Sequence, residues 1–386
     1  MRPHALVIAG SLSQKPFSGG HTWALMQYAL GFRELGWEVL FLDQIDSSLC
    51  VDPSGGRVAP IESVNVAFLD GLMKRFGLGA DYALIVDGGR EWIGVERTQV
   101  IQRVRDAAFL LNIMGFLSQE EVLAAARRRV FLDIDPGFGQ MWKVLQLHDV
   151  FAGHDAHITI GERIGEPDCG IPTCGLEWIT TPQPIVLSYW PRAEGPSRRF
   201  TSVVSWRGAY GPIDYQGRTY GLRVHEFRKF FDLPRRTDLP FELALDIHRN
   251  DYRDRERLEA AGWALADPRS VAGSPEGYRQ YVQESGAEFM VAKNMYVETR
   301  SGWLSDRSLC YLASGKPVLA HDTGWTLKYP AGTGLVPFTT PDEAEEGARS
   351  IAGDYARHSA EARAVAEEHF SSQKVLGRLV TELGAT

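Results

Sequence analysis

The hydrophobic positions of this chain fall into short apolar runs that alternate with stretches in which apolar residues recur every three or four positions. Short runs bounded by glycine or polar residues predict buried strands, and the longer periodic stretches predict helices. The strands expected in the first half are 4–9, 38–42, 82–86, 108–112, 130–133 and 157–160, with a helix over 22–35 after the first. This alternation predicts a parallel sheet covered by helices.

The same alternation begins again after residue 200. Strands are expected over 201–205, 241–247, 263–266, 288–292 and 317–320, and helices over 222–231, 251–261 and 275–284. Proline and glycine in the run 188–196 indicate a linker. We therefore expect an α/β protein with two Rossmann-like domains, 1–190 and 197–360, that face each other across a cleft. The segment after residue 341 has a helical pattern, and its end, 361–386, is expected to return to the first domain.

Composition supports two domains and excludes several classes of function. A chain of 386 residues is longer than one hydrophobic core usually serves. A net charge of -8 argues against a nucleic-acid partner, because a phosphate backbone is normally met by a clustered positive surface. No apolar run is long enough to span a bilayer, and the start Met1-Arg2-Pro3-His4 lacks the apolar region of a signal peptide, so a cytoplasmic location is expected. The four cysteines are too few and too irregularly spaced to predict a disulfide framework.

The richest chemical signal lies between two strands of the second half. The run 300–307 follows the strand expected near 288–292 and opens a helix that ends at Gly315-Lys316-Pro317. Free amides at a helix N-terminus, a serine cap and flanking arginines favour binding of a phosphate. The candidate ligands are Arg300, Ser301, Gly302, Ser305, Asp306 and Arg307. An ordinary capped helix would show much of the same pattern, and Asp306 could equally complement the helix dipole or orient Arg307.

Further candidates for a nucleotide-diphosphate site follow neighbouring strands. Lys293 comes directly after the strand 288–292 and could either neutralise a diphosphate or stay solvated. Arg207 follows the strand 201–205, and the carboxyl ends of parallel strands meet at one edge, so it points toward the cleft unless it forms a surface salt bridge. Asp322, Thr323 and Gly324 follow the strand 317–320, where an aspartate turn is the simpler explanation.

The order of these motifs resembles that of the GT-B glycosyltransferases, and in particular of the bacterial spore-maturation (CgeB-like) glycosyltransferases. The runs that carry the resemblance are 293–303, 305–307 and 311–319 in the second half, and 18–23, 133–138 and 224–227 elsewhere. Retaining GT-B enzymes carry two glutamates eight positions apart around this helix. The matching positions here are Gly302 and Cys310, which leaves ribose recognition and the stereochemical outcome open.

The resemblance implies a hexosyltransferase-like enzyme that moves a sugar from a UDP- or TDP-sugar to a small-molecule acceptor, such as a secondary metabolite. It assigns the acceptor to 1–190 and the nucleotide sugar to 197–360, gives Arg207 a role in assisting the leaving diphosphate, and places Asp322, Thr323 and Gly324 against the donor sugar. No prosthetic group or metal is expected, because arginines and a helix dipole would neutralise the diphosphate. A homodimer is left open, and the alternative is a degenerate or non-glycosyl nucleotide-binding protein on the same scaffold.

The candidate base lies in the first half. His21 follows Ser18-Gly19-Gly20 at the start of the helix expected over 22–35, where the helix dipole disfavours the imidazolium and so favours a neutral base. Asp87, after the strand 82–86, is the carboxylate expected to orient it. Purely structural roles are equally compatible with both residues. Asp133 and Asp135, at another strand end, are held in reserve as bases, although Pro136-Gly137 also makes a turn there.

Overall fold

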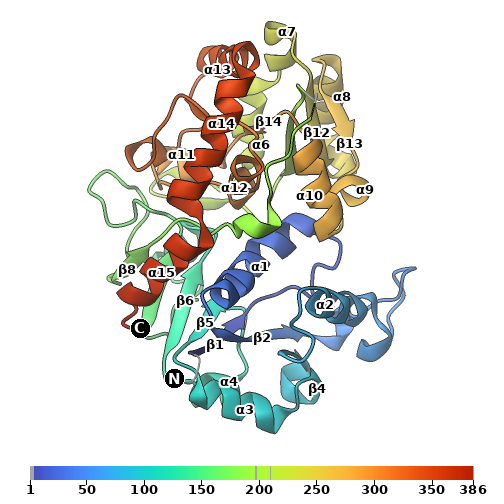
Figure 1. Cartoon of the computed structure of the whole chain (residues 1–386), viewed down its shortest axis with the longest axis vertical. Coiled ribbons are helices and arrows are strands. Elements are labelled where there is room, and N and C mark those ends of the chain that lie inside the picture. The colour runs from blue at the N-terminus through green and yellow to red at the C-terminus, as the bar shows by residue number, and fades with distance from the viewer. Residues whose placement is uncertain (1–3, 196–197, 209, 386) are drawn as a thin grey trace.

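Each half of the chain forms its own sheet in the computed structural model, which describes residues 4–195, 198–208 and 210–385 (Figure 1). The first sheet has eight strands in the order β4-β3-β2-β1-β5-β6-β7-β8, and all neighbours are parallel except β3 and β4. Its strands are β1 (Ala5–Ala9), β2 (Glu38–Ile45), β3 (Tyr82–Val86), β4 (Glu91–Gly94), β5 (Leu110–Ile113), β6 (Arg129–Asp133), β7 (Ala156–Thr159) and β8 (Trp178–Thr180).

The second sheet has six strands in the order β13-β12-β9-β14-β15-β16, and every pair in it is parallel. Its strands are β9 (Phe200–Ser205), β12 (Phe241–Asp246), β13 (Ala264–Ala266), β14 (Ala287–Met290), β15 (Val318–His321) and β16 (Leu335–Phe338). A separate antiparallel hairpin joins β10 (Ile213–Tyr215) to β11 (Arg218–Tyr220). The strand order reverses between β9 and β14, so the ligand-binding crevice of such a sheet is expected at their carboxyl ends.

Helices cover both faces of each sheet, as a parallel sheet with apolar strands requires. All residues of β3 and β5 are buried. The helices of the first half are α1 (Gly19–Glu34), α2 (Val64–Arg75), α3 (Arg97–Asp106), α4 (Glu120–Ala125) and α5 (Phe138–Val144). Those of the second half are α6 (Arg223–Phe227), α7 (Leu233–Thr237), α8 (Tyr252–Ala260), α9 (Pro268–Ala272), α10 (Pro275–Glu284), α11 (Asn294–Glu298), α12 (Asp306–Ala313), α13 (Pro341–Gly353), α14 (Tyr355–Val365) and α15 (Ser372–Glu382).

The expected alternation of strand and helix is confirmed, and so is the α/β class with two Rossmann-like sheets. Only one helix of the first half was predicted from the sequence, and α2 and α3, which have 12 and 10 residues, were not. The pattern also missed short or half-exposed elements: β4, β8, the β10–β11 hairpin, β16, and α11 between β14 and the motif at 300–307. Elements of three to five residues show too few turns or alternations for periodicity to reveal them. The helical segment after residue 341 is three helices, which are interrupted at Asp354 and by a π-helical turn over Ala366–Phe370.

The C-terminal helix returns to the first domain, as expected. Ser371, just before α15, forms a parallel bridge with Ile185, and the hydroxyl of Ser372 donates a hydrogen bond of 3.2 Å to Glu34 at the end of α1. A Cβ at Gly31 of α1 would lie 2.6 Å from Leu376, so α1 and α15 touch where α1 has no side chain. Figure 1 shows α15 beside β8 of the first sheet, below α14 of the second domain.

The two domains also pack directly on each other through α1 and α10. Trp23 of α1 donates a hydrogen bond of 2.8 Å to the carbonyl of Pro275 at the start of α10, and its ring contacts that of Trp190 with centroids 5.0 Å apart. A Cβ at Gly19 would lie 2.3 Å from the carbonyl oxygen of Ser274, closer than any real contact. Glycine at this position is therefore required for the N-terminus of α1 to reach the second domain.

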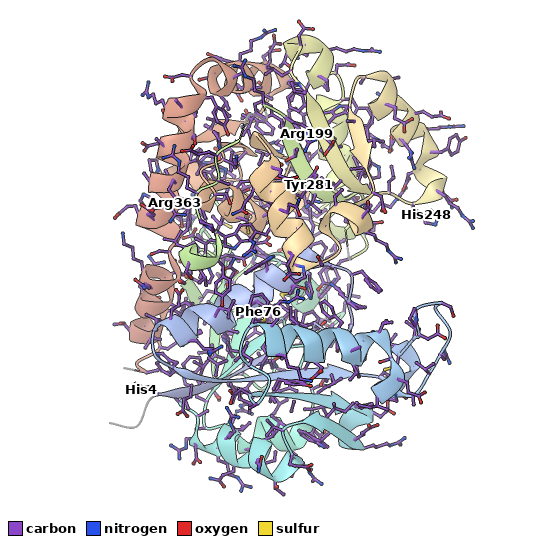
Figure 2. All side chains as sticks on the ribbon, turned by 45° about the vertical axis from the view of Figure 1, so that its right-hand side comes forward. His4, Phe76, Arg199, His248, Tyr281 and Arg363 are labelled. Atoms are coloured by element: carbon purple, nitrogen blue, oxygen red, sulfur yellow. The ribbon has the colours of Figure 1, made fainter. Side chains whose placement is uncertain are left out.

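The segment between the domains is packed rather than loose. The expected linker 188–196 begins in a short 3-10 turn over Leu187–Tyr189, and Trp190 is fully buried. Arg363, labelled in Figure 2, donates a hydrogen bond of 2.8 Å to the carbonyl of Trp190.

Pro196, at the end of the expected linker, and Ser197, at the expected boundary, lie outside the described residues, as do Met1 and Thr386. The division at 190, 197 and 361 stays a prediction. In the part of the chain that is described, no helix is both long and apolar enough to cross a bilayer.

Leu376→Ala should reduce the free energy of unfolding by about 2 to 5 kcal/mol, because it removes a fully buried side chain from the contact between α15 and α1. The measurement is urea denaturation followed by circular dichroism. Gln373→Ala, an exposed position on the same helix, is the control and should change stability by less than about 0.5 kcal/mol. Equal stabilities of the Leu376→Ala variant and the wild type would show that α15 does not hold the domains together.

Candidate functional site

A cavity of about 690 Å³ lies between the domains at the carboxyl edge of the second sheet, and we call it the interdomain cavity. The second domain lines it with the ends of β9, β12 and β13 and with the starts of α9 and α12. The first domain closes it with Phe17 and Ser18 of the loop after β1 and with Gly20 and His21 at the start of α1. Charged side chains dominate the lining: Arg223, Arg255, Arg269 and Arg307 beside Asp246, Asp267 and Asp306. Its position next to the reversal of strand order is the usual place for a ligand in such a sheet.

Arg307 joins the two strands at this reversal. Its Nε donates to Glu288 on β14, and its Nη1 donates a hydrogen bond of 2.9 Å to the carbonyl of Val203 on β9. Glu288 is fully buried, and burial raises the pKa of its carboxyl. Burial alone would lower the pKa of Arg307, but Glu288 outweighs it and the guanidinium stays charged. Arg307 thus helps to hold the sheet together and also lines the cavity.

The helix start that the sequence predicted is present. The hydroxyl of Ser305 accepts a hydrogen bond of 3.3 Å from the amide of Arg307 and caps α12, and Asp306 occupies the first turn. Burial raises the pKa of the Asp306 carboxyl. Asp306 and Arg307 line the interdomain cavity, so the N-terminus of α12 opens toward it. This arrangement offers an anion a helix dipole and backbone amides.

Arg223, at the start of α6, is the cation that sequence reasoning missed. Its Nη1 donates a hydrogen bond of 3.3 Å to the carbonyl of Ser205, but its Nε is buried without a hydrogen-bond partner among the described residues. Burial, with a contribution from Arg307, lowers the pKa of Arg223 to about 10. A buried donor without a partner is costly and indicates a missing acceptor. The sequence predicted a helix over 222–231 and a resemblance at 224–227, but neither pattern indicated that Arg223 would lie at the cavity.

His21 lines the same cavity as the N-terminus of α12. Its Nε2 lies 2.7 Å from the carbonyl of Ser11. A carbonyl only accepts hydrogen bonds, so Nε2 carries the proton and Nδ1 is left as the basic nitrogen. Burial, and then the charge of Lys15, lower the pKa of His21 to about 4. The imidazole is therefore neutral at pH 7.

The structure does not bring Asp87 to His21. Asp87 accepts a hydrogen bond of 2.8 Å from the amide of Ser47 and lines a different cavity in the first domain, where neither His21 nor any residue of α12 takes part. The backbone carbonyl of Ser11 occupies the orienting position that was expected for a carboxylate. Asp87 does lie at the carboxyl edge of the first sheet. It follows β3, however, and β2 separates β3 from β1, after which His21 comes.

Lys293 pairs with a residue of the first domain. Its Nζ lies 2.8 Å from Oδ1 of Asp135, and Tyr296 donates a further short hydrogen bond to the same carboxylate. The ammonium also lies 4.7 Å from the ring centroid of Phe138. Burial lowers the pKa of Lys293, and Asp135 opposes this effect. Both residues are thus engaged with each other across the domain interface, and their roles toward a donor or a proton stay predictions.

Asp133, the other reserve base, is enclosed in a turn. Its carboxylate accepts hydrogen bonds from the side chains of Gln140 at 2.7 Å and Thr159 at 3.0 Å and from the amide of Asp135. Burial raises its pKa to about 6. This network fixes the turn after β6, which is the structural role that Pro136-Gly137 indicated.

Residues 300–302, which begin the motif at 300–307, contact the first domain and do not line the interdomain cavity. The amide of Arg163, in the loop after β7, donates a hydrogen bond of 3.0 Å to the carbonyl of Ser301. Gly302 has a φ of 75°, and a Cβ there would lie 2.6 Å from Arg163. The position at which retaining GT-B enzymes carry a glutamate is thus filled here by an arginine from the other domain. Arg300 is exposed and lies 3.4 Å from Asp168.

The turn after β15 packs beside this contact. Asp322 accepts hydrogen bonds of 2.8 Å from the amide of Gly324 and from the hydroxyl of Thr326, and Thr323 donates one of 2.6 Å to the carbonyl of Trp303. The amide of Gly302 donates to Thr323, so the two turns are joined. These contacts describe an aspartate turn and leave the expected contacts to a donor sugar as predictions.

Arg207 lies at the end of β9, as expected, but its guanidinium pairs with Asp251 and is 57% exposed. Arg207 is not among the residues that line the interdomain cavity.

The structure brings His21, Asp306 and Arg307 to one cavity, and Ser305 caps the helix that opens toward it. It places Arg207, Lys293, Arg300 and Asp87 in ion pairs or hydrogen bonds elsewhere. Among the described residues, no group of three or more His, Cys, Asp or Glu side chains could hold a metal ion.

Comparison of the chain with protein-family models and with curated protein sequences found no match. Solved structures match along its whole length. An alpha-glucosyltransferase in complex with UDP and a 13-mer DNA aligns with a TM-score of 0.61, 12% identity and 100% coverage of both chains. The Anabaena protein HepE, in complex with UDP and glucose, aligns with a TM-score of 0.54 and 12% identity over 99% of this chain and 100% of its own.

AviGT4, a glycosyltransferase involved in avilamycin A biosynthesis, aligns with a TM-score of 0.53 and 13% identity over 98% of this chain and 97% of its own. At these identities the matches establish the arrangement of the two sheets and of the returning helix. The chain has the GT-B fold, as the order of its motifs led us to expect.

Proposed function

We propose that this protein is a glycosyltransferase that takes a sugar from a nucleotide-diphosphate donor, UDP- or TDP-linked, and transfers it to a small-molecule acceptor. The observation that carries the proposal is the interdomain cavity, where the N-terminus of α12, Arg307 and Arg223 meet at the reversal of strand order. Two of the matched structures hold UDP, and the motif order resembles that of the CgeB-like group. The bound sugar nucleotide would lie between the second sheet and the start of α1, which carries His21.

The charges of the cavity suit a departing diphosphate. Arg223 has a buried Nε without a partner, and phosphate oxygens accept charge-assisted hydrogen bonds from such a donor. The amides of α12 add a dipole that favours an anion. Fixed cationic donors of this kind stabilise the charge that develops on a leaving group, which is why we propose a mechanism independent of metal.

His21 is the proposed base. Its Nε2–H is held by Ser11, so Nδ1 is the nitrogen proposed to accept the proton, and its position in the first turn of α1, on the wall that the first domain forms, supports this role. A diphosphate in the cavity adds negative charge, which raises the proton affinity of the imidazole at the moment a proton must be removed. Asp135, paired with Lys293, is the reserve base of this proposal.

The acceptor is proposed to be a small molecule. AviGT4 belongs to the biosynthesis of a natural product, whereas the alpha-glucosyltransferase was crystallised with DNA. The net charge of -8 disfavours a nucleic-acid acceptor for this chain, because long-range repulsion would oppose the approach of a polyanion. The transfer of a hexose and the homodimer that the sequence left open stay predictions.

Arg223→Ala should weaken binding of UDP by about 1 to 3 kcal/mol, the range for a charge-assisted hydrogen bond, and leave uridine binding nearly unchanged. Isothermal titration calorimetry with both ligands measures this difference. Arg253→Ala, an exposed arginine of α8 outside the cavity, is the matched control. If the wild type bound neither UDP nor TDP, the proposal of a nucleotide-sugar enzyme would fail. Binding of UDP without any release of sugar from UDP-glucose or TDP-glucose in the presence of acceptors would favour the non-glycosyl alternative.

Arg307→Ala should show a different phenotype, with loss of both stability and UDP affinity. Removing the guanidinium leaves Glu288 buried without its counter-charge, which costs about 3 to 5 kcal/mol of folding free energy. Urea denaturation measures this loss, and the double variant Arg307→Met/Glu288→Leu should recover most of it because no charge is left unpaired. A single variant as stable as the wild type would contradict the structural role of the ion pair.

His21→Ala should reduce turnover by about 10² to 10⁴ with little change in UDP affinity. A base acts in its neutral form, and the pKa of His21 is lowered to about 4, so activity should be present above that value and lost as the pH falls through it. The measurement is kcat/KM between pH 4 and 8 for both proteins. An acidic limb near the ordinary histidine pKa of about 6.5, or normal turnover of the alanine variant, would remove His21 from the mechanism.

A further inference from the structure

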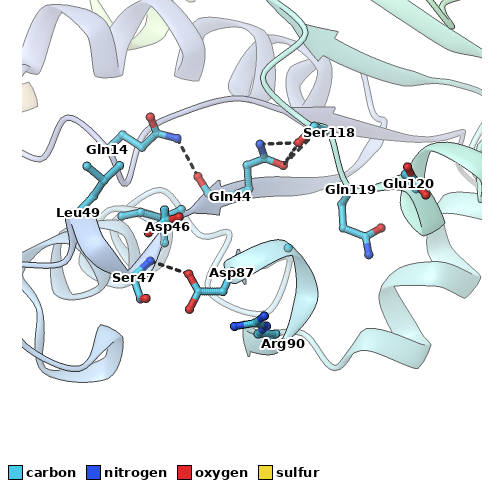
Figure 3. Close-up of a pocket in the computed structure, with 12 residues that line it drawn as sticks. Gln14, Gln44, Asp46, Ser47, Leu49, Asp87, Arg90, Ser118, Gln119 and Glu120 are labelled. Carbon is cyan, nitrogen blue, oxygen red and sulfur yellow. Dashed lines mark hydrogen bonds between the residues drawn. The ribbon is translucent and has the colours of Figure 1, made fainter.

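A second cavity, of about 840 Å³, lies in the first domain, and we call it the polar cavity (Figure 3). It lies at the carboxyl edge of the first sheet, where the loops after β1, β2, β3 and β5 meet. Its lining contains three amides, three carboxylates, two hydroxyls and one guanidinium: Gln14, Gln44, Gln119, Asp46, Asp87, Glu120, Ser47, Ser118 and Arg90. A concave site of this size with converging polar groups is a typical ligand site.

One loop separates the polar cavity from the interdomain cavity. Gln14 lines the polar cavity, and Phe17 and Ser18, a few residues further along the same loop, line the interdomain cavity. The loop is fixed to the first domain, because Asp43 accepts hydrogen bonds of 2.8 Å and 2.7 Å from the amides of Leu12 and Ser13. The loop after β1 thus contributes residues to both cavities, which fits a donor site and an acceptor site that share one segment of chain.

Part of the polar cavity is already ordered for a ligand. Gln14 donates a hydrogen bond of 2.9 Å to the carbonyl of Gln44, and the side chain of Gln44 accepts one of 3.0 Å from the amide of Ser118 (Figure 3). These contacts fix the planes of the amides before a ligand arrives, which lowers the entropic cost of binding. Asp87 has a φ of 46°, and local backbone strain of this kind is common where a turn presents a side chain to a ligand.

Other groups of the polar cavity lack partners. Among the described residues, the guanidinium of Arg90 and the carboxylate of Glu120 form no hydrogen bond and no ion pair. Asp87 uses one carboxylate oxygen for the amide of Ser47, and its other oxygen has no protein donor in the described part of the chain. Planar donors and acceptors that stand free beside fixed amides suit a ligand with many hydroxyls, because each hydroxyl both donates and accepts.

We propose that the polar cavity binds the acceptor and that this acceptor is a polyhydroxylated molecule without negative charge, such as an oligosaccharide or a sugar-bearing natural product. The inference rests on the proposed glycosyltransferase function. Three carboxylates to one guanidinium repel a phosphorylated acceptor. Leu49, which is 49% exposed, supplies an apolar surface for the C–H face of a sugar ring.

The experiment is saturation-transfer NMR on the full chain with maltotriose, lactose and chitobiose as neutral probes and with glucose 6-phosphate beside glucose. The wild type should bind at least one neutral oligosaccharide, and glucose 6-phosphate should bind more weakly than glucose. Arg90→Ala and Gln14→Ala, both at exposed positions, should each weaken oligosaccharide binding by about three- to tenfold, the effect of one hydrogen bond. Arg105→Ala and Gln102→Ala, exposed on α3 outside the cavity, are the matched controls and should bind as the wild type does.

Binding of UDP is measured in parallel on every variant and separates this inference from the proposed function. All four variants should bind UDP as the wild type does. No binding of any neutral probe, unchanged binding in Arg90→Ala and Gln14→Ala, or tighter binding of glucose 6-phosphate than of glucose would each overturn the inference, even if UDP binds. Oligosaccharide binding that depends on Arg90 and Gln14 in a protein that binds no UDP would instead support a carbohydrate site and refute the proposed glycosyltransferase.

Discussion

The arrangement of this molecule depends on the close approach of α1 to the second domain. A Cβ at Gly19 would lie 2.3 Å from the carbonyl oxygen of Ser274 and 2.7 Å from that of Ala272, so only glycine permits the contact. The approach lets Trp23 donate to Pro275 and pack against Trp190, and one hydrophobic cluster therefore contains residues of both domains. The loop before α1 is thereby carried over the carboxyl edge of the second sheet and becomes one wall of the interdomain cavity.

Buried charge sets the chemistry of the opposite wall. A carboxylate on a central strand such as Glu288 is costly to bury unless a cation and further hydrogen bonds compensate it. Arg307 provides this compensation and in turn fixes the start of α12 beside β9. The same ion pair that makes the sheet stable therefore presents a guanidinium and a helix N-terminus to the cavity. Arg223, whose buried Nε has no hydrogen-bond partner among the described residues, adds positive charge to this wall.

The two cavities differ in charge as a donor site and an acceptor site would. The interdomain cavity contains four arginines, which suit a diphosphate, whereas the polar cavity has more carboxylates than cations. The loop after β1 borders both, so a change in its position would alter both at once. Lys293 and Asp135 form a second link between the domains near the same edge, and this buried pair limits how far the cleft can open without breaking a strong interaction.

Periodicity in the sequence determined the class of the fold. Apolar runs such as Tyr82–Val86 must be buried on both faces, and the only arrangement that does so for many short strands is a parallel sheet between helices. The serine cap and the arginine of the helix at Ser305 could also be recognised, because a cap acts on its own helix and needs no distant partner. The short elements β16 and α11 could not, since they contain too few residues to show a period.

Only the tertiary structure decided which polar residues share a site. Sequence reasoning placed Asp87 beside His21 because both follow strands, but strand order separates them and the carbonyl of Ser11 holds the imidazole instead. Lys293 was expected either to neutralise a diphosphate or to stay solvated, and it meets Asp135, a residue far away in the chain. Arg223 had no signal of its own, because its importance comes from the burial of a donor without a partner. The sequence by itself determined the local elements and their caps, whereas partners across domains depend on packing that no local pattern encodes.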